Sequence, residues 1–299
     1  MPELPDILLY LHALRPRLVG YQVRAVRLAS PFLLRSVEPP LASVEGRRIV
    51  DLHRLGKRVA IEAEGGLHLV FHLMIAGRFK WKDPGTRIPG KVGLLALDFE
   101  HGTLILTEAG TRRQASLYVV QGGDALIQHN PGGLEVLDTD HAAFAAALRR
   151  DNHTLKRALT DPHLFSGIGN AYSDEILHAA RLSPFKQTGA LSDDDVRRLY
   201  EATTRTLTQW ITRLQRETGD AFPEKVTAFR EGMAVHGRYG QPCPDCGSAV
   251  QRIVYASNEA NYCATCQTGG RLLADRSLSR LLREDWPRTL DELERKRRG

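Results

Sequence analysis

The sequence is poor in cysteine, and its few cysteines lie close together. Only four of the 299 residues are cysteines, and all lie between Cys243 and Cys266. This pattern excludes a secreted scaffold held by many disulfides, and it favours one metal site.

Long apolar runs are also missing. No run approaches the roughly 18 residues that span a membrane, and the N-terminus lacks the cationic and apolar regions of a signal peptide. There is no internal repeat or low-complexity linker. We therefore expect a cytoplasmic protein that has no membrane partner.

The charge allows a polyanionic partner without requiring one. The net charge is +6 and the pI is near 9.2, whereas many proteins this basic bind no nucleic acid. Hydrophobic residues make up 42% of the chain, enough for the cores of two domains with accessory modules.

Turn signals and periodicity predict an α+β multidomain protein. An N-terminal β-sandwich (1–132) opens with a helix and is followed by a helical domain (133–236), a cysteine module (237–270) and a charged extension (271–299). The extension is expected to be a solvated helix. In the helical domain, Ser192 and Asp195 form a capping box that begins a long helix. The strands of the sandwich are expected in the segments 23–30, 48–64, 67–81, 92–107 and 116–121.

The cysteine module has the spacing of a four-thiolate zinc site. Two C-x-x-C knuckles flank a short hairpin and supply Cys243, Cys246, Cys263 and Cys266. Four protein ligands leave no open position, so we expect one structural zinc ion. The ribbon could staple a small domain or contact nucleic acid, and spacing does not separate these roles.

A glycine-rich turn precedes a helix in the second domain. Gly167, Gly169 and Asn170 lie where exposed backbone N–H groups and a helix N-terminus would suit a phosphate. The alternative is that Asn170 is an ordinary N-cap after a tight turn.

The N-terminus combines a potential nucleophile with an acid. Removal of Met1 would give Pro2 a free secondary amine beside the Glu3 carboxylate. Such an amine titrates about 2.5 pH units below lysine and so offers roughly 300-fold more free base at neutral pH. The alternative is that Pro5 simply opens a helix.

In this order, the elements resemble the formamidopyrimidine-DNA glycosylase and endonuclease VIII family of base-excision repair enzymes. The resemblance spans about residues 1 to 268 and rests on the segments 2–6 (PELPD), 56–57 (GK), 155–156 (LK), 167–170 (GIGN), 235–240 (VHGRYG) and 243–267, the zinc ribbon. It implies a helix-two-turns-helix fold for the second domain.

The resemblance also implies a bifunctional glycosylase and abasic-site lyase that acts on damaged, oxidised double-stranded DNA. Pro2 would attack C1′ of an extruded nucleotide, Glu3 would move protons, and Lys57 would lie near the reacting phosphate. The DNA-binding residues carried over are His72, Arg112, Arg113, Lys156, Gly167, Gly169 and Asn170. A lesion-binding protein without efficient excision and a generic zinc-ribbon binder remain as alternatives.

Departures from the family fall on residues that handle DNA. Asn258 stands where the family hairpin has an arginine, Ile75 where it commonly has a methionine wedge, and Gln114 where it has a phenylalanine. Losing one charged phosphate hydrogen bond costs about 1.5 to 3 kcal/mol, so Arg252 or Arg271 is a candidate substitute. The segment 219–225 lacks a threonine-rich lesion loop, which leaves the damaged base undetermined.

Overall fold

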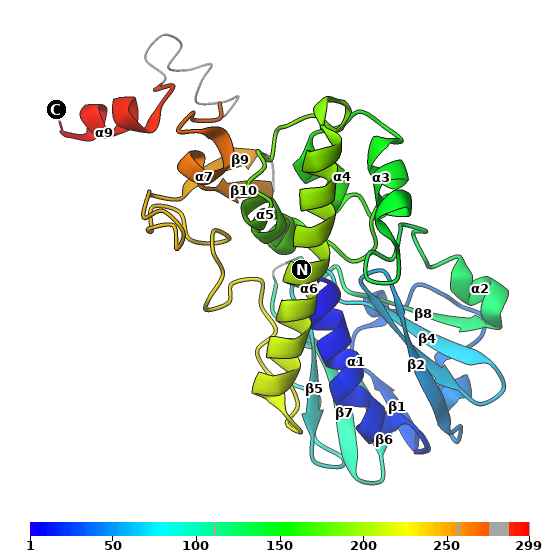
Figure 1. Cartoon of the computed structure of the whole chain (residues 1–299). Coiled ribbons are helices and arrows are strands. Elements are labelled where there is room, and N and C mark those ends of the chain that lie inside the picture. Colours follow the sequence, from blue (N-terminus) through cyan, green and yellow to red (C-terminus); the bar gives the residue numbers. More distant parts are fainter. Residues whose placement is uncertain (111, 256–257, 275–286, 299) are drawn as a thin grey trace. The chain divides into compact units, whose positions relative to one another are not determined.

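The computed structural model describes residues 1–110, 112–255, 258–274 and 287–298, and the chain forms two compact units (Figure 1). The N-terminal unit comprises 1–132 and 209–228, and the C-terminal unit comprises 133–208 and 229–299. The division after residue 132 coincides with the predicted boundary. Residues 209–228, however, group with the N-terminal unit, and the zinc ribbon groups with the helical residues.

The N-terminal unit is a sandwich of two antiparallel four-stranded sheets behind a leading helix, as predicted. Each of the three longest predicted segments divides into two strands at a turn. The leading helix is α1 (Leu4–Leu18). The strands of one sheet are, in order, β1 (Ala25–Leu28), β6 (Gly93–Phe99), β7 (Gly102–Glu108) and β5 (Gly77–Lys82). The strands of the other sheet are, in order, β2 (Ile49–Leu55), β3 (Arg58–Ala63), β4 (Leu67–His72) and β8 (Ser116–Gln121) (Figure 1). Short helices η1 (Pro31–Leu33), η2 (Leu41–Val44) and α2 (Gly123–Ile127) complete the unit.

The core of the sandwich joins α1 to the inner faces of both sheets. Tyr10 of α1 is fully buried and meets Phe79 edge to face, with ring centroids 5.4 Å apart. Phe71 of the other sheet meets the same Phe79 ring at 5.3 Å. Because these rings pack against one another, α1 is held against both sheets at Tyr10.

The helical part of the C-terminal unit follows the predicted local signals. It contains α3 (His141–Arg149), α4 (Leu155–Thr160), α5 (Asn170–Ala179), η3 (Thr188–Ala190) and α6 (Asp193–Thr218). The predicted capping box begins α6, since Ser192 N–H donates to Asp195 Oδ2 and Asp195 N–H donates to Ser192 Oγ, each at 3.1 Å.

The ribbon and the extension share a small core. The ribbon contains β9 (Gln251–Tyr255), β10 (Asn258–Tyr262) and α7 (Ala264–Thr268), and the extension contains α9 (Leu290–Arg298). Leu290 and Leu293 pack against a buried cluster that includes Tyr262 and Leu273. The expectation of a merely solvated tail helix is therefore corrected for α9, which has an apolar side in contact with the ribbon. Within the described ranges, no helix has the length and apolar character needed to cross a membrane.

Candidate active site and nucleic-acid interface

The residues at the start of α1 are held firmly rather than frayed. Pro2 is buried, Glu3 is the N-cap and is 3% exposed, and Asp6 is 1% exposed. The Asp6 Oδ2 atom accepts the Glu3 N–H at 2.9 Å. Asp6 therefore fixes the backbone that carries the predicted nucleophile and acid.

The surroundings of the terminal amine favour its free-base form. Burial lowers the pKa of the Met1 amine, and the nearby charges of Arg78 and Lys57 lower this pKa further, while Glu3 and Asp6 act in the opposite direction. An amine in this environment is a better nucleophile at neutral pH than a fully solvated amine.

Lys57 is carried on a two-residue turn between β2 and β3, where Leu55 pairs with Arg58. The turn needs glycine at its first position because Gly56 has a φ of +61°. Lys57 influences the pKa values of both the Met1 amine and His72, so the structure brings the predicted Lys57 close to these groups.

His72 ends β4 opposite Arg58. Burial, together with the positive charges of Arg58 and Lys57, lowers the pKa of His72 to about 4. The imidazole is therefore neutral at pH 7, and it can offer DNA an N–H donor rather than a positive charge.

A tight turn after β4 presents Ile75. Gly77 N–H donates to the Leu73 carbonyl at 2.8 Å, and a Cβ added to Gly77 would lie 2.3 Å from that oxygen. Ile75 is 61% exposed, which suits a wedge. Arg78, which the sequence did not single out, donates to the Ile75 carbonyl at 3.1 Å and so fixes the turn.

The loop with Arg112 and Arg113 is anchored by a carboxylate that the sequence analysis missed. Glu108 is 2% exposed, and it accepts the Gln114 N–H at 2.9 Å and the Ala115 N–H at 3.2 Å. Arg112, Arg113 and Gln114 are all exposed. Glu108 thus holds the base of a loop that presents two cations to solvent.

In the C-terminal unit, Lys156 has an internal partner. Its side chain is 3% exposed, and its Nζ atom lies 2.5 Å from Asp174 Oδ1 and donates to the Asn170 carbonyl at 2.6 Å. The ammonium therefore has two partners inside the protein, whereas the sequence suggested that Lys156 contacts a phosphate. Lys156 instead positions the first turn of α5.

The glycine turn leads directly into α5. Gly169 is the N-cap and Asn170 is the first helical residue, so the reading of Asn170 as an N-cap is wrong. Gly167 has a φ of +80°, which favours glycine. Asn170 is partly exposed at this helix N-terminus, and the backbone around it has the polarity that an anion requires.

Two acidic residues fasten α5 to the segment before the ribbon and to the ribbon itself. Asp174 Oδ2 lies 2.8 Å from His236 Nδ1 and accepts from Asn261 Nδ2 at 3.1 Å. Glu175 accepts three successive backbone N–H groups from residues 234–236, at 2.7 to 2.9 Å. The turn that carries Asn170 and the ribbon therefore belong to one buried polar network.

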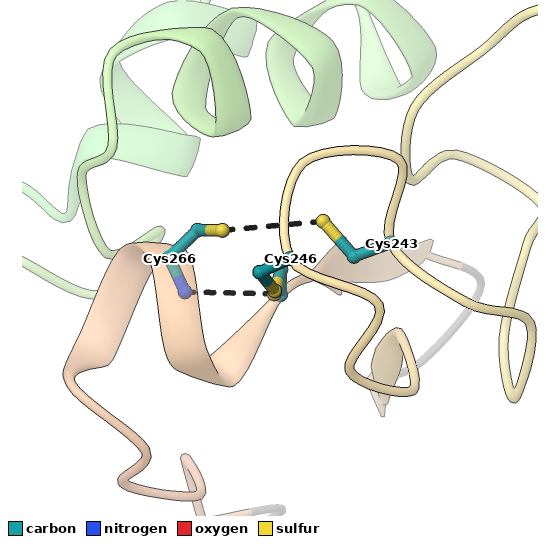
Figure 2. A group of neighbouring side chains, drawn as sticks. Cys243, Cys246 and Cys266 are labelled. Atoms are coloured by element: carbon teal, nitrogen blue, oxygen red, sulfur yellow. Dashed lines mark hydrogen bonds between the residues drawn. The ribbon is translucent and has the colours of Figure 1, made fainter.

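The four predicted metal ligands converge. All four sulfur atoms lie within 4.8 Å of one another, and Figure 2 shows Cys243 and Cys266 with their sulfur atoms turned toward each other. The sulfur atoms of Cys243 and Cys266 are 3.9 Å apart, and those of Cys246 and Cys263 are 3.4 Å apart. These distances are close to the separation of about 3.8 Å between sulfur atoms that each lie about 2.3 Å from a tetrahedral zinc ion.

The chemistry of this donor set also requires a cation. Burial raises the pKa of Cys263 to about 11 and also raises the pKa of Cys266, because a buried thiolate without a cation is costly. The cysteines hold one structural zinc ion, and His178 Nε2 lies 3.3 Å from Cys243 Sγ beside it.

The candidate substitutes for the missing hairpin arginine differ in their contacts. Arg252 lies 3.8 Å from the Glu259 carboxylate and 4.8 Å from the centre of the Tyr239 ring. Arg271 is exposed just beyond α7. The side chain of Asn258 and the tail arginines Arg276, Arg280 and Arg283 lie outside the described residues.

Sequence comparisons match three successive parts of the chain to known domains. Residues 1–117 match the formamidopyrimidine-DNA glycosylase N-terminal domain, and residues 133–220 match the H2TH domain of the same proteins. Residues 240–269 match the zinc finger found in FPG and IleRS.

Relatives of known sequence and structure agree. The chain is 35% identical to formamidopyrimidine-DNA glycosylase of Thermus thermophilus, over 90% of this chain and 100% of the relative. The crystal structure of the MutM (Fpg) protein of that organism matches with a TM-score of 0.74 at 34% identity, over 89% of this chain and 98% of the other. The Lactococcus lactis Fpg in complex with abasic-site DNA shares the fold, with a TM-score of 0.77 at 23% identity over 89% of this chain and 99% of the other.

Proposed function

The chain belongs to the formamidopyrimidine-DNA glycosylase family, and from this premise we propose that it excises a damaged base from DNA and then cleaves the abasic strand. The observation that carries the proposal is the fixed N-terminal pair, in which Pro2 and Glu3 are buried at the start of α1 and tied by Asp6. The chemistry requires prior removal of Met1.

The Pro2 nitrogen supplies the nucleophile. A bond forms between this nitrogen and C1′ as the bond from C1′ to the damaged base breaks, and the base leaves with a proton. Glu3 protonates the sugar ring oxygen as the ring opens, which leaves a charged iminium between Pro2 and C1′. Loss of a C2′ proton then expels the 3′ phosphate, and water releases the sugar from Pro2.

Residues of both units supply the contacts to DNA. Lys57, Arg112 and Arg113 provide charge for phosphates, and His72 provides a neutral donor. In the C-terminal unit, the N-terminus of α5 at Asn170 binds a phosphate through backbone dipoles, with Gly167 and Gly169 shaping the turn before it. The partner is double-stranded DNA that carries a lesion, and the monomeric state and cytoplasmic location are part of the same proposal.

Borohydride trapping on an oligonucleotide with an abasic site tests the proposal. Borohydride reduces the iminium to a stable amine, so the demethionylated protein should form a covalent adduct that peptide mapping places on Pro2. Glu3→Gln should slow base excision by a factor of about 100 or more, which is the contribution expected of a general acid.

A form with an uncleaved N-terminal extension is the matched control. Its Pro2 nitrogen is an amide, so this form should bind the same oligonucleotide without forming an adduct. If the demethionylated, zinc-loaded protein binds abasic DNA and forms no adduct either, the proposal of catalysis fails. The chain would then be a lesion-binding protein, a reading that fits the exposed polar Gln114 at the position where the family has a phenylalanine.

A further inference from the structure

Three metal-ligand side chains gather on the sandwich face that points away from the core. His53 lies on β2, Glu62 on β3 and His68 on β4, and Glu62 is paired directly with His68. Their chain neighbours Leu52, Ile61 and Leu69 are buried in the core. Since side chains alternate along a strand, all three polar residues lie on the opposite face.

The spacing of these side chains suits a divalent metal. One ligand atom from each of the three residues lies within 4.8 Å of the other two, and His53 Nε2 is 2.6 Å from Glu62 Oε2. Zinc holds imidazole nitrogen and carboxylate oxygen at about 2.0 to 2.2 Å, so its ligand atoms are about 3.3 to 3.5 Å apart. Side-chain rotations of His53 and Glu62, which are 36% and 27% exposed, would bring the ligands to these distances.

His68 gives an independent sign that a ligand is missing. The residue is 5% exposed, and its buried Nδ1 atom lacks a hydrogen-bond partner in the described part of the chain. An unsatisfied buried nitrogen costs about 1 to 3 kcal/mol, which coordination would recover.

We propose that His53, Glu62 and His68 form a second zinc site, separate from the four-cysteine site. Two histidines and one carboxylate leave a fourth position for water. The ion would join three adjacent strands, β2, β3 and β4, and two of these strands flank the turn that carries Lys57. The site therefore adds a metal-dependent restraint to the sheet behind Lys57.

Metal stoichiometry in the untagged, zinc-loaded protein tests this site. Equilibrium dialysis against micromolar free zinc, followed by elemental analysis, should give two zinc ions per chain in the wild type. His53→Asn and Glu62→Gln should each give one, because these partly exposed residues can be replaced without opening the core. Saturating zinc should also raise the unfolding temperature of the wild type but not of these two variants.

Cobalt distinguishes this site from the cysteines. One equivalent of Co²⁺ added to protein that carries a single zinc ion, in its four-cysteine site, should give visible d–d bands without the intense thiolate-to-cobalt charge-transfer band of a cysteine site. His12→Gln, which changes an exposed histidine on α1, is the control and should keep both zinc ions. A wild-type stoichiometry of one, or a stoichiometry of two that survives His53→Asn and Glu62→Gln, would overturn the proposal and leave only the His53–Glu62 hydrogen bond.

Discussion

At the scale of single residues, the positive charge near the terminal amine has two effects. Lys57 and Arg78 lower the pKa of the amine and would also attract a DNA phosphate. Lys57 and Arg58 add to the effect of burial and keep His72 neutral. Lys57 thus acts on both groups: with burial it favours the free-base form of the Met1 amine, against the opposing effects of Glu3 and Asp6, and it favours a neutral His72.

The pKa of His72 predicts a measurable pH dependence of stability. It is about 4 in the folded protein and 6.5 in the unfolded chain, so between these values the unfolded chain binds more protons and stability rises with pH. The stabilisation is complete above pH 6.5 and is lost as the pH falls toward 4, by at most about 3 kcal/mol. In calorimetry from pH 7 to 4.5, His72→Gln should lose less stability than the wild type.

His12→Gln is the control for that measurement, since His12 is exposed and its replacement should leave the wild-type pH slope intact. Equal slopes for wild type and His72→Gln would show that His72 titrates normally and is solvated.

Replacing Lys156 should reduce the stability of the protein without removing a contact to a DNA phosphate. Lys156→Met leaves the buried Asp174 carboxylate without its cation, and removing one partner of a buried pair typically costs about 3 to 5 kcal/mol. Lys82→Met, which breaks an exposed pair with Glu224, should cost about 1 kcal/mol or less. Thermal unfolding measures the loss of stability in both variants.

The salt dependence of DNA binding should be the same for folded Lys156→Met and wild type. A flatter slope of log Kobs against log salt for Lys156→Met would show that Lys156 contacts a phosphate.

At the scale of elements, a feature could be predicted from the sequence when the residues that form it lie close together along the chain. The hairpins, the α6 capping box and the paired cysteine knuckles depend on residues a few positions apart, and the sequence predicted them. Asp174 instead meets His236 and Asn261, which are 62 and 87 residues away, and Arg78 donates to the carbonyl of Val226, 148 residues away. Such partners carry no local signal, which explains why the role of Arg78 was missed.

Zinc removal tests the ribbon as an element. Because the metal site and the fold form together, a chelator should unfold the ribbon. The hydrogen bond from Asn261 to Asp174 should then break. DNA affinity should fall, while the amount of borohydride adduct at saturating DNA should be retained, because Pro2 lies in the other unit. Hydrogen exchange should show faster exchange in β9 and β10. Unaltered DNA binding after complete zinc removal, verified by elemental analysis, would contradict a role for the ribbon in binding.

At the scale of the whole molecule, a net charge of +6 sets a long-range attraction to DNA, but affinity depends on which cations meet phosphates. Arg252 is engaged by Glu259 and the Tyr239 ring, whereas Arg271 is exposed beyond α7 in the same unit. We therefore predict that Arg271, rather than Arg252, supplies the cation missing at position 258.

Salt dependence of binding separates these two arginines. Each phosphate contact contributes about 0.9 to the slope of log Kobs against log salt, so Arg271→Ala should weaken binding and reduce the slope by about that amount. Arg252→Ala should leave the slope unchanged, because its charge is already balanced by Glu259. A reduced slope for Arg252→Ala with a wild-type slope for Arg271→Ala would place the substitute on the zinc hairpin itself. The residues beyond α7 would then contribute through packing, as Leu290 and Leu293 do, rather than through charge.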